Sequence, residues 1–221
     1  EGLREREVVL GGKSFFVIEA AETSSMVDEW IENQMATVDP FGVVLWPAAQ
    51  VLSGIIQAGE IDVEGKGVLE VGCGTGLCSL VAARAGAVVT STDTNPLPLR
   101  MLEMAAERQG IELSTSLLDI EAPAKSLPSF DVLVAADCMY NTRVAQGLAR
   151  LCAGAAMRGA VLLVADSVNI AREGFQEELE RLGCAYEVDF RRMSFTGSAV
   201  GVDMDVERES DVAVYAFTTP K

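Results

Sequence analysis

The chain has 221 residues, 49% of them hydrophobic, so it is long enough and apolar enough to fold around a packed core. Its 17 basic and 33 acidic residues give a net charge of −16, which argues against the broad basic surface that nucleic-acid binding requires. The sequence contains no histidine, which excludes imidazole bases and histidine-ligated zinc.

The first forty residues predict a β-hairpin and a short helix. Residues 8–10 and 15–18 form two apolar runs around Gly11-Gly12, a dipeptide suited to the positive φ angles of a tight turn. The Thr-Ser-Ser run at 23–25 is typical of a helix start. We interpret residues 1–40 as an N-terminal extension and residues 41–221 as the main domain.

The main domain predicts alternating helices and strands. A helix begins at Trp46-Pro47, because proline is tolerated in the first turn. Apolar strands are predicted at 68–71, 88–91, 113–117, 132–135 and 161–165, and the helices between and after them at 78–85, 97–109, 144–153 and 174–182. Continuous apolar strands separated by helices indicate a parallel sheet covered on both faces.

The last third of the chain changes this pattern. Residues 186–190 and 212–217 predict two more strands, separated by a connection that contains Gly, Ser and Asp. We expect them to close one sheet edge as an antiparallel pair. The predicted fold is α/β: a Rossmann-like, doubly wound, seven-stranded sheet, mostly parallel, with an antiparallel C-terminal hairpin.

A glycine-rich segment ends the first strand of this sheet and opens a helix. It runs Leu-Glu-Val-Gly-Cys-Gly-Thr-Gly, with glycines at Gly72, Gly74 and Gly76. Glycines there let the chain turn sharply and bring bare backbone amides against a ligand at a helix N-terminus. A dinucleotide site would need the spacing G-x-G-x-x-G, so NAD is disfavoured. The alternative is a strand-to-helix turn without a ligand.

An acidic residue closes the next strand of the predicted sheet. Asp93 lies 23 residues after Glu70, where an acid in this fold class accepts hydrogen bonds from a ribose. Its alternative role is an N-cap for the helix after Asn95-Pro96. Taken together with the glycine loop, Asp93 predicts a ligand that carries adenosine and lacks a pyrophosphate.

These features resemble the class I, seven-β-strand, S-adenosylmethionine-dependent methyltransferases over roughly residues 40 to 221. The resemblance is carried by the glycine segment, by Asp93, and by Leu118-Asp119 after the third strand. It implies S-adenosyl-L-methionine as the methyl donor and S-adenosyl-L-homocysteine as the product.

Two further segments narrow the resemblance. Trp46-Pro47-Ala48-Ala49-Gln50 is similar to the W-P-x-x-x segment of the methyltransferase-like protein-lysine methyltransferases, and Ala136-Asp137-Cys138-Met139-Tyr140 to their D-x-x-Y signature. That group includes the lysine methyltransferase of the electron-transfer-flavoprotein β-subunit. The likeness implies a protein substrate that presents a lysine.

The resemblance also implies a cofactor-binding set. Asp93 would take the ribose hydroxyls, Asp119 would accept from the adenine amine, and Glu70 would steady the loop or reach the α-amino group through water. The Trp46 ring would lie over the cofactor, although a core aromatic and a plain loop carboxylate are the alternatives for Trp46 and Asp119. The complete set is Trp46, Glu70, Gly72, Cys73, Gly74, Gly76, Asp93, Thr94, Asp119 and Ala136.

Asp137 and Tyr140 follow the fourth strand and are the candidate catalytic residues. Asp137 would hold an incoming ammonium, and Tyr140 would orient or shield it. We assign Asp137 to substrate binding because a carboxylate opposes the deprotonation that a lysine nucleophile needs, which costs roughly 4.6 kcal/mol at pH 7. The alternatives are a helix cap before Asn141 and ordinary packing of Tyr140. Cys138-Met139 stand where planar-nitrogen methyltransferases carry prolines, which disfavours that chemistry.

Two rival functions stay open: a small-molecule amine or heterocycle N-methyltransferase, and a non-catalytic cofactor-binding module. A protein acceptor predicts a shallow, acidic mouth above Asp137, whereas a small molecule predicts a lidded, apolar pocket. The acids at 203, 205, 207 and 209 fit either a polar strand face or an acidic rim for a basic peptide.

The remaining expectations concern the surroundings of the chain. Its five cysteines are odd in number and none forms a C-x-x-C pair, so we expect no metal and a reducing compartment, either the cytoplasm or an organelle interior. No stretch approaches the roughly 18 apolar residues of a membrane span, and we expect no membrane and no nucleic-acid partner. A leader could have been removed before Glu1 or never existed. A monomer is the default.

Overall fold

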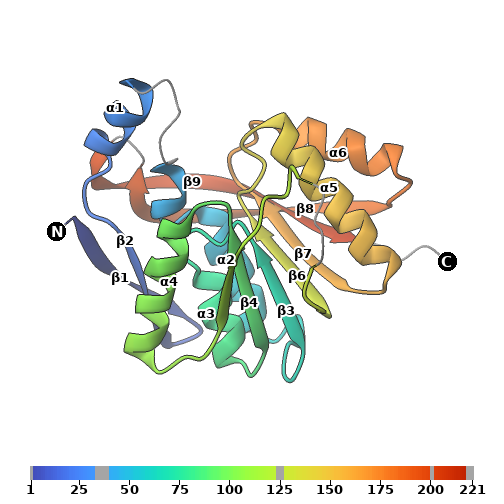
Figure 1. Cartoon of the computed structure of the whole chain (residues 1–221), viewed down its shortest axis with the longest axis horizontal. Coiled ribbons are helices and arrows are strands. Elements are labelled where there is room, and N and C mark those ends of the chain that lie inside the picture. The colour runs from blue at the N-terminus through green and yellow to red at the C-terminus, as the bar shows by residue number, and fades with distance from the viewer. Residues whose placement is uncertain (1, 33–39, 123–126, 200–201, 218–221) are drawn as a thin grey trace.

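The computed structural model describes residues 2–32, 40–122, 127–199 and 202–217. Its centre is a mixed seven-stranded sheet (Figure 1). Five strands are parallel, and β9 runs antiparallel to both of its neighbours. This confirms the predicted fold class. In spatial order the strands are β5 (Ser114–Leu117), β4 (Val88–Asp93), β3 (Gly67–Val71), β6 (Val132–Ala136), β7 (Val161–Asp166), β9 (Val202–Phe217) and β8 (Tyr186–Ala199).

Helices cover both faces of the sheet because side chains of the central strands alternate between two apolar clusters. Val132 and Val134 of β6 point to one cluster, and Leu133 and Ala135 point to the other. The first cluster is covered by α2 (Pro47–Gln57), α3 (Leu77–Arg84) and α4 (Pro96–Gln109), and the second by α5 (Thr142–Met157) and α6 (Arg172–Arg181). A short helix α1 (Ser24–Glu32) and a 3₁₀ turn η1 (Pro40–Val43) precede them.

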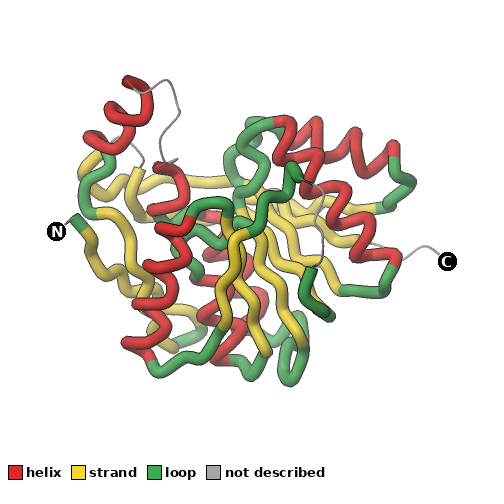
Figure 2. The backbone as a smooth tube through the Cα atoms, viewed as in Figure 1, coloured by secondary structure: helices red, strands yellow, loops and turns green. Residues whose placement is uncertain are grey.

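The predicted connection between the last two strands is wrong, because most of it is strand. β8 and β9 pair in register from Tyr186 opposite Phe217 to Ser198 opposite Asp205. Figure 2 shows this long ribbon passing beyond the parallel strands. The Gly, Ser and Asp content suggested a loop, but Phe195 and Gly197 are buried between exposed residues. A continuous ladder with a buried face therefore overrides weak strand propensity.

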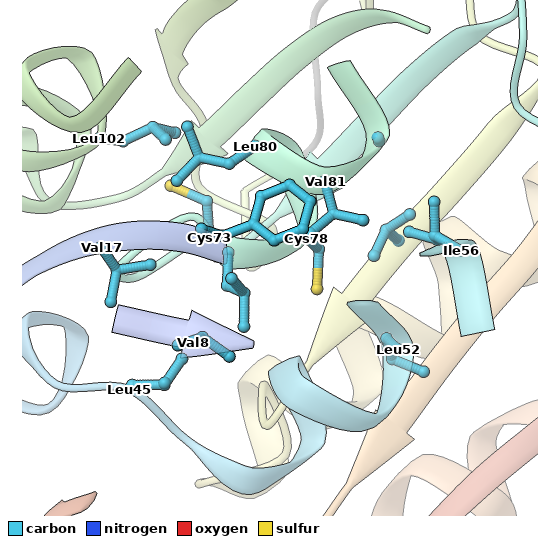
Figure 3. Close-up of a cluster of buried hydrophobic side chains, with 14 of the residues drawn as sticks. Val8, Val17, Leu45, Leu52, Ile56, Cys73, Cys78, Leu80, Val81 and Leu102 are labelled. Atoms are coloured by element: carbon cyan, nitrogen blue, oxygen red, sulfur yellow. The ribbon is translucent and has the colours of Figure 1, made fainter. Parts of the chain in front are cut away.

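The N-terminal hairpin consists of β1 (Leu3–Leu10) and β2 (Lys13–Ala20), paired antiparallel through a turn at Gly11 and Gly12. Those two glycines have φ angles of 56° and 78°, as a two-residue hairpin turn requires. Val17 and Phe15 belong to the same cluster as residues of α2, α3 and α4 (Figure 3). The boundary at residue 40 stays a prediction, while the apolar side chains on both sides of it share one core.

Candidate active site

A cavity of about 670 Å³ opens where β3, β4 and β6 end. Its position is the crevice at the carboxyl ends of parallel strands, and its size is that of a small-molecule site. Nine of the twelve predicted site residues line it: Trp46, Gly72, Gly74, Asp93, Thr94, Asp119, Ala136, Asp137 and Tyr140. Glu70, Cys73 and Gly76 do not.

The glycine loop shapes one wall of this cavity. Gly72 and Gly74 have φ angles of 62° and 52°, which other residues rarely adopt. A Cβ atom on Gly72 would lie 2.6 Å from Sγ of Cys138. Gly76 starts α3 in the left-handed conformation, and a Cβ there would lie 2.4 Å from Cδ1 of Leu102 on α4. Gly76 is therefore required for helix packing, one layer behind the cavity.

Asp93 connects the glycine loop after β3 to the start of α4. Its Oδ2 accepts a hydrogen bond of 3.1 Å from the Gly74 amide, and its Oδ1 accepts one of 3.0 Å from the Asn95 amide. The side chain of Asn95 caps α4 by accepting from the Leu97 amide at 2.9 Å. Asn95, and not Asp93, is therefore the N-cap of α4, so the alternative role of Asp93 as a helix cap is wrong. Asp93 is 8% exposed and lines the cavity.

Glu70 points away from the cavity toward α3. It accepts hydrogen bonds from the amide of Ser79, at 2.9 Å, and from the Ser79 hydroxyl. The Ser79 amide belongs to the first turn of α3 and would otherwise lack a partner. Burial raises the pKa of Glu70 to about 7, against the lowering effect of these hydrogen bonds. In this geometry Glu70 steadies the helix behind the loop. Cys73 is buried in the core beside it.

The Asp137 carboxylate is held by hydrogen bonds from two segments of the protein. Its Oδ1 accepts from the amide and hydroxyl of Ser167, at 2.6 and 2.8 Å, and its Oδ2 accepts from the Ala48 amide at 3.0 Å. These contacts tie the first turn of α2 to the loop after β7. Burial raises the pKa of Asp137 to about 6, again opposed by the hydrogen bonds. The cap of α5 is Asn141, which accepts from the Val144 amide at 2.9 Å.

The backbone of Asp137 is strained, with a φ angle of 54°. An aspartate tolerates the left-handed region better than most residues, but the conformation persists only where the surroundings enforce it. The Asp137 amide donates to the carbonyl of Ala165 at 3.0 Å, which fixes the turn against β7. The strain places the carboxylate at the cavity wall, where it also serves as a structural link.

Trp46 is the N-cap residue of α2 and stands in the cavity wall. Its Nε1 donates to the carbonyl of Phe41 at 2.9 Å, and the two rings lie 6.5 Å apart. The Trp46 side chain packs on the core cluster and remains half-buried at the cavity wall, so the core alternative is confirmed, while contact with the cofactor stays a prediction.

The cavity wall carries one sign of charge. Four carboxylates line it, those of Asp93, Asp119, Glu121 and Asp137, and within the described part of the chain it has no lysine or arginine. Asp119 keeps its loop turn by accepting from the Glu121 amide at 2.9 Å. An anionic, partly enclosed cavity favours a cationic ligand through focused attraction.

Sequence reasoning missed several wall residues. Phe41, Gly42, Asn95, Val168 and Ile170 all line the cavity. Asn95 had a signal, because an Asn-Pro pair directly after a strand marks a helix start at the ligand edge. The others follow no motif, and only the fold brings them to the cavity. Ile170, at 65% exposure, and Tyr140, at 42%, form an apolar side of its mouth.

Among the described residues, no group of three or more acidic or cysteine side chains is arranged to bind a metal ion. No helix in the same part of the chain has the length and apolar character needed to cross a membrane. All five cysteines are free and buried.

Comparisons with known proteins agree with this geometry. A family model described as lysine methyltransferase matches residues 26–181. A stretch of 53 residues is 51% identical to protein N-lysine methyltransferase METTL21A of Danio rerio, covering 24% of each chain. A stretch of 112 residues is 31% identical to ubiquinone biosynthesis O-methyltransferase of Methylocella silvestris, covering 51% of this chain and 43% of the relative.

Among solved structures, a 16S rRNA methyltransferase of T. thermophilus in complex with AdoMet and guanosine has a TM-score of 0.64 at 18% identity, covering 98% of this chain and 51% of that one. This likeness shows the fold. The chain matches less than half the length of the two curated relatives.

Proposed function

The chain belongs to the lysine methyltransferase family, and we propose that it methylates the side-chain amine of a lysine in a protein substrate. It is a methyltransferase, and S-adenosylmethionine is its cofactor. The observation that carries the proposal is the cavity itself, which combines a glycine loop, Asp93 and Asp137 in one wall of uniform negative charge.

The residues of the cavity fit the cofactor. Gly72 and Gly74 leave the wall free of Cβ atoms, and Asp93 fixes the Gly74 amide beside them. With its sulfonium and ammonium groups and one carboxylate, the cofactor is a net cation, which suits the four carboxylates. When bound, S-adenosylmethionine supplies a methyl group that is already activated by the positive charge on sulfur.

Asp137 contributes position and charge. It accepts three hydrogen bonds, and a carboxylate has about four lone-pair sites, so one direction is left for an incoming amine. Through Ala48 and Ser167 the same carboxylate also links α2 to the loop after β7. In-line placement of nucleophile and methyl carbon supplies most of the rate in such a transfer. The amine forms the new C–N bond, the C–S bond breaks toward sulfur, and the proton leaves to water.

A small-molecule acceptor is the second candidate, and two observations favour it: the likeness to the ubiquinone biosynthesis O-methyltransferase and the apolar residues Ile170 and Tyr140 at the mouth. Asp119 and Glu121, both exposed, also line the cavity and form an acidic side of it. That acidic side suits a basic peptide, which is why we favour the protein substrate.

The test supplies methyl-labelled cofactor to the purified protein together with a proteome lysate, followed by mass spectrometry of the labelled fraction. We expect a protein lysine with a mass gain of one or more methyl groups, and loss of that label with the Asp137→Asn variant. Label confined to small molecules would overturn the proposal in favour of the second candidate. No label in any fraction, with normal cofactor binding, would favour a non-catalytic module.

A further inference from the structure

An arginine of the C-terminal hairpin contacts the wall of the cofactor cavity. The guanidinium carbon of Arg208 lies 5.9 Å from the ring centroid of Trp46 and 5.2 Å from that of Phe195. Both distances fall within the range of about 6 Å over which a cation is attracted to an aromatic face. Arg208 therefore bridges a cavity residue and the ribbon formed by β8 and β9.

The position of Arg208 is determined by the strand pairing. Arg208 stands directly opposite Phe195 in the register of β8 and β9. The Phe195 ring is only 1% exposed and lies over Gly197, where a Cβ atom would be 2.4 Å from the ring. Because residue 197 has no side chain, the ring can lie along the strand and present a face to Arg208.

The same stretch of β9 is held to the N-terminal hairpin. Asp205, three residues before Arg208, accepts hydrogen bonds from Arg4 and from Arg6, the latter at 2.5 Å. Arg6 also donates to the carbonyl of Thr196, at 3.5 Å. These contacts fix the outer half of the ribbon against β1, so Arg208 projects from a rigid support.

The backbone just before Trp46 is hydrogen-bonded to Glu19, which also pairs with Arg4 and Arg6. The buried carboxylate of Glu19 accepts from Nε of Arg4 at 2.8 Å and from Nε of Arg6 at 2.7 Å. Its second oxygen accepts from the Leu45 amide at 3.4 Å. The chain before α2 is therefore restrained at its backbone by Glu19 and at the Trp46 ring by Arg208.

We propose that Arg208 is a positioning residue for the cofactor: it holds the Trp46 indole in the cavity wall, so that cofactor affinity depends on the C-terminal hairpin. Arg208, Phe195 and Asp205 all lie outside the segment that the family model matches. The proposal rests on the assignment of the cavity to the cofactor and on contact between Trp46 and that cofactor, and does not depend on the methyl acceptor.

The experiment uses the whole protein with Trp30→Phe, which leaves Trp46 as its single tryptophan. Cofactor and product affinities are measured by calorimetry, and exposure of the indole by acrylamide quenching of its fluorescence. In Arg208→Gln we expect the dissociation constants to rise about fivefold, as loss of a partly desolvated cation–π contact implies, and the quenching to increase. Arg208→Lys retains the cation and should restore the affinity to within about twofold of the parent.

The matched control is Arg192→Gln. Arg192 lies in β8 with a side chain that is 71% exposed and pairs with Glu209, so its loss removes the same charge without touching Trp46. Equal losses of affinity in both variants would indicate a general charge effect and overturn the proposal. Unchanged affinity and quenching in Arg208→Gln would also overturn it. If Trp46→Ala keeps full affinity, the Trp46 ring does not contact the cofactor, and the proposal fails while the methyl-transfer proposal stands.

Discussion

The Gly74 amide donates a hydrogen bond to Oδ2 of Asp93 across 3.1 Å, and this bond joins the end of β3 to the end of β4. The two residues are adjacent because β3 and β4 are parallel neighbours whose carboxyl ends meet at one sheet edge. One carboxylate thus shapes the glycine loop and faces the cavity.

The first prediction concerns this bond. Asp93→Ala should weaken cofactor binding by about tenfold or more, because it removes a charged acceptor from the loop amide and from the ligand. Calorimetry with S-adenosylhomocysteine measures the change. Thr94→Ala, on the same wall but exposed, is the comparison and should cost less. Full affinity in Asp93→Ala would place the nucleoside elsewhere.

The second prediction separates the role of Asp137 in methyl transfer from its role in the stability of the fold. Asn tolerates the left-handed backbone and keeps one carbonyl acceptor, but its NH2 group cannot accept the remaining hydrogen bond, from Ala48 or from Ser167. Asp137→Asn should therefore lower the thermal midpoint slightly and still bind the cofactor. Methyl transfer should fall by about tenfold or more, because the negative charge beside the amine is lost. Asp137→Ala should lower the midpoint as well, since it also removes the acceptor of the Ala48 and Ser167 amides. Undiminished transfer in Asp137→Asn would refute the role in substrate binding.

The third prediction concerns helix packing behind the cavity. Gly76→Ala should destabilise the fold by about 3 kcal/mol, because it combines a left-handed φ of 74° with a Cβ 2.4 Å from Leu102. Urea unfolding measures the difference. Gly54→Ala, in α2 with nothing within 4 Å of the added Cβ, should be neutral or stabilising. Equal stability of the two variants would show that the α3–α4 contact tolerates the methyl group.

The fourth prediction concerns pH. The pKa of Glu70 is about 7 in the folded protein, above the ordinary value of 4.5. The folded state therefore binds a proton at Glu70 more tightly than the unfolded state does. The contribution of this proton to the free energy of unfolding is fully present below pH 4.5 and is lost as pH rises through 7. Glu70→Gln cannot ionise and should match the parent near pH 4.5 and exceed its free energy of unfolding at pH 8. Denaturant unfolding at both pH values tests the sign, and a variant less stable than the parent at pH 8 would contradict it.

The sequence determined the fold class and nine of the residues that line the cavity. Short apolar strands alternating with helices permit few arrangements, and a parallel sheet brings residues that follow successive strands to one edge. Asp93, Asp119 and Asp137 each follow a strand, so their common location could be predicted without coordinates.

Only the tertiary structure decided which way the side chains turn and what they contact. Glu70 lies inside β3 and Asp93 is the last residue of β4, and both are acidic residues of the predicted cofactor set. In the structure Glu70 turns toward α3, where it accepts from the Ser79 amide, whereas Asp93 lies at the cavity wall and accepts from the Gly74 amide. The contact between Arg208 and Trp46 joins residues far apart in the chain, and no local pattern carries it. The spacing of apolar and turn residues along the sequence determines which segments form helices and strands. Contacts between distant elements depend instead on how the whole core packs.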